Sequence, residues 1–163
     1  MGAIKGVGEN AVKTIVECRK EARYKSIFDL AKRIDLRAAN KKAFENLALA
    51  GGFDEFGDTH RAQYFHYDGD NITFLEKAMR FGAKFQENEN SSQVSLFGDA
   101  SDVQIAEPVV PPCEEWNTLE KLSREKEVVG IYISGHPLDD YKFEMKYFCN
   151  TKLQALSNLE PLV

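Results

Sequence analysis

The chain has 163 residues, enough for one domain or two small ones, and its 43% apolar and 29% charged residues are ordinary for a globular protein. No apolar stretch approaches the length of a membrane span, so no membrane partner is expected. The three cysteines are odd in number and widely spaced, which excludes a Cys-x-x-Cys zinc or redox site and favours a reducing, cytoplasmic environment.

Positive charge is concentrated at the amino-terminal end of the chain. Residues 1–50 carry eleven Lys or Arg against six Asp or Glu, whereas residues 51–163 carry ten against twenty. A basic end on an acidic chain is typical of a protein that contacts nucleic acid.

Two glycines, Gly6 and Gly8, flank one apolar residue, and a helical pattern of apolar residues starts directly after them. Glycine adopts a positive φ without steric cost, so the pair permits a tight hairpin. The first amides of the following helix lack internal partners and carry partial positive charge, which favours a bound anion such as a phosphate. A plain turn between two helices explains the same pattern, and the basic charge of residues 1–50 favours the phosphate.

Two further helices are expected before residue 52. Ser26 is a good N-cap for a short amphipathic helix, and Asn40 is another N-cap for a helix that Gly51 ends. Lys41 and Lys42 stand at the start of this last helix, where they would either touch DNA or remain solvated.

Residues 53–85 predict one or two more helices. His60 and His66 have no partner at ligand spacing, so we interpret both as ordinary polar residues and expect no metal site. From Phe85 to Glu120 there is no Lys or Arg while eight acids occur, and this polar, proline-containing composition predicts a mobile linker.

Within that linker, Gln93-Val94-Ser95-Leu96-Phe97 places two adjacent apolar residues in a hydrophilic stretch. One interpretation is that Phe97 folds back onto the helices. The other is a short linear motif that inserts Leu96 and Phe97 into an apolar pocket of a partner protein, with Gln93 bonding at its rim.

Helices are expected again from Trp116 onward, and Asn117 or Thr118 would cap the first of them. The run 128–133 suits a strand by propensity or the continuation of a helix, and we expect the helix. Gly135 would end it, His136 would cap, and Pro137 would begin an amphipathic helix bearing Leu138, Tyr141, Met145 and Phe148.

The hairpin and its following helix resemble a helix-hairpin-helix, which binds the DNA backbone without sequence preference. Taken with several other motifs, the chain resembles the alpha subunit of bacterial DNA polymerase III, the C-family of replicative polymerases. The motifs that carry this resemblance are Gly2-Ala3-Ile4-Lys5-Gly6-Val7-Gly8, Ser26-Ile27-Phe28-Asp29-Leu30, Asn40-Lys41-Lys42, Ala50-Gly51-Gly52-Phe53-Asp54 and Gly135-His136-Pro137-Leu138.

The resemblance implies a mainly α fold: a tandem helix-hairpin-helix whose first helix lies mostly upstream of Met1, additional helices and a long disordered acidic linker. The expected divisions are 1–56 for the tandem DNA-binding unit, 57–85 for a helical extension, 86–115 for the linker, and 116–163 for helices that lead to an OB-fold. It implies that the DNA-binding residues are Lys5, Gly6, Val7, Gly8, Glu9, Asn10, Lys13, Lys41 and Lys42.

The resemblance also implies a sliding clamp (beta subunit) as partner, contacted through Gln93, Ser95, Leu96 and Phe97, together with double-stranded DNA and other replisome subunits. No catalytic residue, metal site or cofactor is expected within these 163 residues, since the family holds its Mg²⁺ in a palm domain upstream. Alternatives are an error-prone relative, a DNA-repair helix-hairpin-helix protein, or a protein-interaction module that does not bind DNA.

Overall fold

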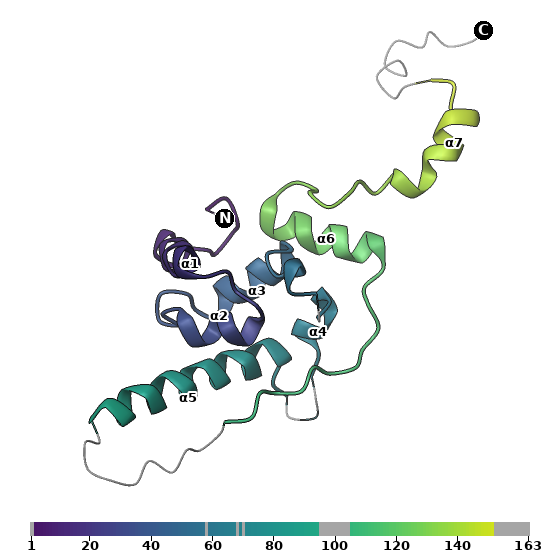
Figure 1. Cartoon of the computed structure of the whole chain (residues 1–163). Helices are drawn as coiled ribbons and strands as arrows, with labels where there is room; N and C mark the ends of the chain where they lie inside the picture. The colour runs from purple at the N-terminus through teal and green to yellow at the C-terminus, as the bar shows by residue number, and fades with distance from the viewer. Residues whose placement is uncertain (1, 58, 68, 70, 95–104, 152–163) are drawn as a thin grey trace, which may run out of the picture.

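The computed structural model describes residues 2–57, 59–67, 69, 71–94 and 105–151, with the side chains of 90–94 excluded (Figure 1). Over these residues the regular secondary structure is helical, apart from an isolated β-bridge between Tyr67 and Thr73, which confirms the predicted mainly α fold. The elements are α1 (Glu9–Glu21), α2 (Ile27–Arg33), α3 (Lys41–Leu49), the 3-10 turn η1 (Asp54–Phe56), α4 (Arg61–Phe65), α5 (Phe74–Val94), α6 (Thr118–Val129), the 3-10 turn η2 (Asp139–Tyr141) and α7 (Lys142–Tyr147).

Side-chain caps set the starts of three helices, as their sequences predict. Ser26 Oγ accepts from the amide of Asp29 at 3.1 Å, and Asn40 Oδ1 accepts from that of Ala43 at 3.0 Å. Asn117 caps α6 in the same way. Each cap satisfies an amide that has no partner inside its helix.

The core is formed where α2 lies along α5 and α3 packs beside them (Figure 1). Phe28 of α2 meets Phe74 and Phe81 of α5 edge-on, with ring centroids 5.8 and 5.5 Å apart. A Cβ at Gly82 would collide with the backbone of Ala31, so glycine is required at this helix crossing.

The predicted linker over 86–115 is corrected at both ends. Helix α5 continues to Val94. The side-chain amide of Gln86 shares its two N–H groups among the carbonyls of Ala31, Lys32 and Ile34, at 2.8–3.1 Å, and so caps the end of α2. A polar sequence occurs both in linkers and in solvent-exposed helices. Composition alone therefore does not distinguish the two for residues 86–94.

Residues 105–115 form no helix, as their prolines require, yet they lie against the helices. The carbonyl of Pro111 accepts from Gln63 at 2.9 Å, and Ile105 and Val110 pack on the core. Trp116 then stacks on Phe65. Residues 105–115 are therefore held by contacts that their composition does not reveal.

The expected helical continuation of α6 through residue 133 is wrong, and no strand forms there either. Gly130 adopts a left-handed conformation with φ of 89°, which ends the helix at Val129. The helix expected to begin at Pro137 is also reduced, since 3-10 turn η2 starts at Asp139 and α7 only at Lys142.

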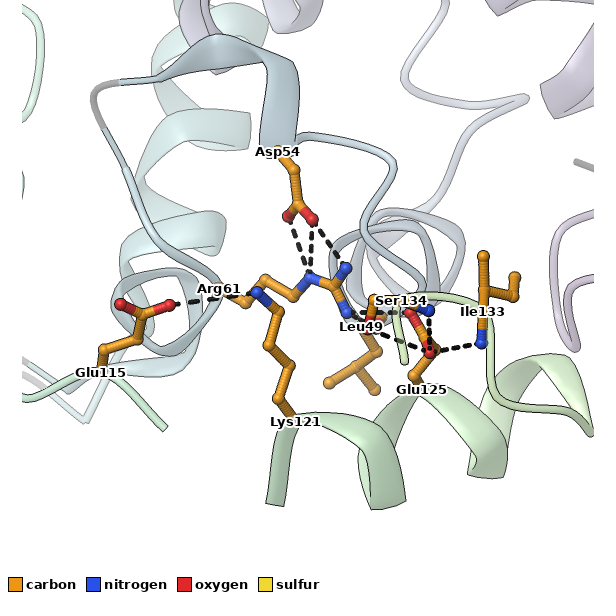
Figure 2. Close-up of polar contacts among 8 residues, drawn as sticks. All are labelled: Leu49, Asp54, Arg61, Glu115, Lys121, Glu125, Ile133 and Ser134. Carbon is orange, nitrogen blue, oxygen red and sulfur yellow. Dashed lines mark hydrogen bonds and ion pairs between the residues drawn. The ribbon is translucent and has the colours of Figure 1, made fainter. Parts of the chain in front are cut away.

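An ion cluster around the buried Arg61 and Glu125 fixes α6 against the rest of the molecule (Figure 2). The Arg61 guanidinium donates to Asp54 at 2.6 Å, to the Leu49 carbonyl at 3.1 Å and to Glu125 at 3.3 Å. Glu125 has no exposed surface and also accepts from the amides of Ile133 and Ser134. Arg61 thus joins the turn after α3 to α6, and Glu125 joins α6 to the segment that follows it.

Candidate nucleic-acid interface

The segment 4–8 forms a tight hairpin just before α1. The amide of Val7 donates to the carbonyl of Ile4 at 3.2 Å, and Gly6 between them has φ of 69°. A side chain at Gly6 would be strained by this φ, so Gly6 is the glycine that the turn requires. Val7 is 6% exposed and anchors the hairpin in the core, so it can face a ligand only through its backbone.

Gly8 plays a different role from the one its sequence suggests. It is the N-cap of α1, with φ of −70°, a conformation that other residues also adopt. The expectation that the hairpin needs a glycine at position 8 for its backbone freedom is therefore wrong. It has no side chain to cap the helix, and apart from its chain neighbours no atom lies within 4 Å of the place that a Cβ would take. The start of α1 is therefore open to a ligand, with no cap from Gly8 across its first amides.

The start of α3 lies beside this hairpin. An open depression of about 350 Å³ is lined by Gly6, Val7 and Gly8 on one side and by Ala38, Asn40 and Ala43 on the other. The aliphatic stem of Lys42 passes close to Gly6, at 3.5 Å from a Cβ built there. The fold therefore brings together the hairpin and the helix start that the sequence singled out separately.

The lysines expected to contact DNA differ in their surroundings. Lys5 is exposed on the hairpin. Lys13 pairs with Glu9 at 3.0 Å, and the Lys42 ammonium lies 3.7 Å from a Glu45 carboxylate oxygen. Both lysines are exposed, and ion pairs at such a surface exchange easily with other ions.

Lys41 is committed more firmly, because its Nζ lies 2.6 Å from a carboxylate oxygen of Glu76 on α5. The hydrogen bond to Glu76 raises the pKa of Lys41, and the same bond lowers the pKa of Glu76. Of the two lysines at the start of α3, Lys42 lies beside the hairpin and Lys41 reaches α5.

Two other residues expected at the DNA contact, Glu9 and Asn10, lie exposed in the first turn of α1. Asn10 adds a neutral polar group to the open helix start. The Glu9 carboxylate would repel a phosphate, and its pairing with Lys13 draws it away from the helix start.

The sequence reasoning missed Asn46, which is 3% exposed in α3 and donates from its side-chain amide to the carbonyl of Lys5 at 2.5 Å. A signal was available, because Asn46 is a polar residue on the stripe formed by Ala43 and Leu47. A buried polar side chain must find a partner, and here the partner is the hairpin backbone.

For the predicted clamp motif, the backbone of Gln93 falls in the last turn of α5. Ser95, Leu96 and Phe97 lie outside the described residues. Within the part of the chain that the structure covers, no three His, Cys, Asp or Glu side chains gather in a way that could hold a metal ion, and no helix could span a membrane.

Comparison with known families agrees with this geometry. Residues 1–64 match the family model of the helix-hairpin-helix motif, which covers the hairpin, α1, α2 and α3. The amino-terminal part of the chain therefore belongs to the helix-hairpin-helix class.

The chain is also similar to DNA polymerase III subunit alpha from several bacteria, which confirms the resemblance seen in its motifs. It is 42% identical to the Campylobacter jejuni subunit over 144 residues, which make up 86% of this chain and 11% of that protein. The Vibrio cholerae subunit is 34% identical over 94% of this chain, and the Haemophilus influenzae subunit 35% identical over 96%. The chain spans only 13% of the length of each of these last two relatives.

Proposed function

We propose that this chain is the part of a bacterial replicative DNA polymerase, the DNA polymerase III alpha subunit, that holds double-stranded DNA by its backbone in the cytoplasm. The observation that carries the proposal is the hairpin at Gly6, which leads into an α1 start that Gly8 leaves uncapped and open. A phosphate oxygen at this position would accept from the free amides at the start of α1. The match of residues 1–64 to the helix-hairpin-helix model supports the same contact.

The contact proposed here does not read the base sequence. Its groups are backbone amides and the flexible cations of Lys5, Lys13 and Lys42, which recognise phosphates and not base edges. A polymerase that copies a whole chromosome needs this indifference to sequence, because every position must be held equally well.

We propose further that Gln93, Ser95, Leu96 and Phe97 bind the sliding clamp, the beta subunit, and so tie the polymerase to its template. The support is the Gln-x-x-Leu-Phe spacing together with the similarity to alpha subunits. A weak motif becomes effective once the DNA is also bound, because the second contact then forms within one assembly. Other replisome subunits would join the same complex.

The polymerase reaction of the longer protein is assigned to segments outside these 163 residues. Nucleotidyl transfer uses paired carboxylates that hold two metal ions, and none of the sequence motifs links an acidic pair of this chain to that role. Incubation of the pure chain with primed template, Mg²⁺ and nucleotides should give no extension. Extension by the pure chain would overturn this assignment.

A salt titration tests the DNA contact. Fluorescence anisotropy with two labelled duplexes of unrelated sequence should give equal affinities, with log K falling against log[salt] at a slope of about −2 to −3 if two or three phosphates are contacted. A strong preference for one duplex would contradict backbone binding. Absence of binding at low salt would favour the protein-interaction module instead.

A matched pair of phenylalanine variants tests the clamp contact. Phe97→Ala should weaken binding to the cognate clamp more than about tenfold in calorimetric titration, because it removes an apolar anchor. Phe148→Ala, at a position 76% exposed, is the control and should bind as the parent does. Equal clamp affinity of parent and Phe97→Ala would sink the motif, and a large fall in the Tm of Phe97→Ala would place this residue in the core.

A further inference from the structure

The backbone of Lys5, directly before the turn glycine, is held from two sides. Its amide donates to the carbonyl of Val128 at 2.9 Å, and its carbonyl accepts from the side-chain amide of Asn46 at 2.5 Å. Asn46 belongs to α3 and Val128 to α6, so two elements far apart in the sequence meet at one hairpin residue.

The contact with Asn46 is built into the hairpin. A Cβ at Gly6 would lie 2.9 Å from the Asn46 side-chain nitrogen, so the glycine leaves the room that this amide occupies. Asn46 is buried, and a buried amide that lost its acceptor would carry a desolvation penalty. The geometry therefore favours one position of the hairpin over others.

The second support is rigid because α6 is itself fixed. Glu125, one helical turn before Val129, is fully buried and accepts from Arg61, Ile133 and Ser134. The end of α6 cannot shift without breaking this cluster (Figure 2). Val128 consequently offers Lys5 a carbonyl at a defined place.

We infer that Asn46 is a positioning residue for the DNA-binding hairpin, and that α6 is its second support. This inference rests on the proposed function, and it adds that DNA affinity depends on a side chain that touches no DNA. Loss of the Asn46 donor would leave the Lys5 carbonyl unpaired, so the hairpin would sample other positions and present the α1 start less often.

The test compares Asn46→Leu and Asn46→Ala with Ser26→Ala. All three are uncharged changes that remove one hydrogen bond between a side chain and the backbone, and Ser26 caps α2 instead of holding the hairpin. Two quantities are measured for each: affinity for a duplex at low salt, and hydrogen exchange at the Lys5 amide by NMR.

Both Asn46 variants should lose about fivefold or more in duplex affinity and exchange the Lys5 amide at least about tenfold faster, with protection of the α2 and α5 amides unchanged. Ser26→Ala should change duplex affinity by less than about twofold and leave Lys5 exchange as in the parent. Equal affinity of parent and Asn46→Leu, with Lys5 still protected, would overturn the inference.

The proposed function and this inference fail in different ways. If the parent chain does not bind duplex, the proposed function is lost, and Lys5 exchange alone then decides whether Asn46 positions the hairpin. If neither Asn46 variant folds, exchange of the Asn46 side-chain amide protons in the parent decides. Protection of these protons supports the inference, and exchange as fast as at the exposed side chain of Asn10 overturns it.

Discussion

The body of the molecule, which comprises α1 to α6, and the segment 131–151 have similar apolar patterns but bury them very differently. In the body, most of the described aromatic and aliphatic side chains of α2, α3 and α5 are at most 8% exposed. In the later segment, large apolar side chains remain between 39 and 76% exposed: Ile131, Ile133, Leu138, Tyr141, Phe143, Met145, Tyr147 and Phe148. In Figure 1, α7 lies away from the other helices.

This contrast shows that a periodic pattern predicts which face of a helix is apolar, but not what covers it. Helix α2 buries its stripe because α5 lies along it. Among the described residues, α7 contacts chiefly the neighbouring turn η2. Burial, and the stability that comes with it, is a property of the partner as much as of the helix.

Substitution of one phenylalanine in each region tests this difference in burial, with the largest expected effect. Phe44→Ala in α3 should lower the free energy of unfolding by about 3–5 kcal/mol, because Phe44 is fully buried and its removal leaves a cavity. Phe143→Ala in α7 should change it by less than about 0.5 kcal/mol. Urea denaturation followed by circular dichroism measures both, and similar losses for the two variants would show that α7 is packed in solution.

Arg61 tests whether α6 belongs to the body. Arg61→Met removes the cation between Asp54 and the buried Glu125, and should destabilise the chain by about 3 kcal/mol because a carboxylate is left buried without its partner. The fluorescence of Trp116, the single tryptophan, should report this, since Trp116 stacks on Phe65 and lies under Arg124. A variant as stable as the parent would show that α6 does not depend on the cluster.

Low pH should destabilise the packing of α6, because protonation of Glu125 weakens the contacts that hold this helix. Although burial raises its pKa, hydrogen bonds from Ser134, Ile133 and Arg61 outweigh burial and hold the pKa of Glu125 below its usual range. A lowered folded-state pKa contributes stability above the unfolded value of about 4.3, and this stability is lost as the pH falls through the folded value. Thermal unfolding followed by Trp116 fluorescence should show a Tm that falls below about pH 4.5, and a Tm unchanged between pH 7 and pH 3 would contradict this.

The smallest expected effect on stability is at the open start of α1. Gly8→Val should leave the Tm within about 2 °C of the parent, because φ is −70° and, apart from its chain neighbours, no atom lies within 4 Å of the place that a Cβ would take. The same change should weaken duplex binding about five- to tenfold by covering the free amides. Melting curves and anisotropy on the same samples separate the two effects, and unaltered DNA affinity would place the phosphate contact elsewhere.

The sequence predicts the structure correctly at the starts of several helices and at the turn that requires a glycine. The caps at Ser26, Asn40 and Asn117, the turn at Gly6 and the apolar stripes of α1 to α3 all follow from interactions between residues a few positions apart. The hairpin half of the candidate site could be predicted for the same reason, since the turn and the helix that it starts are contiguous.

Tertiary contacts alone decided the rest. The polar residues 86–94 continue α5, which lies along α2. Residues 105–115 lie on the core because Gln63 and neighbouring side chains hold them. The hydrogen bonds from Asn46 and to Val128 hold Lys5 only because α3 and α6 meet at the hairpin. Lys41 pairs with Glu76 because α5 packs beside the start of α3. The sequence alone determined the caps, the turns and the apolar faces, because these depend on near neighbours. Which groups became partners depended on the packing of elements distant in the chain.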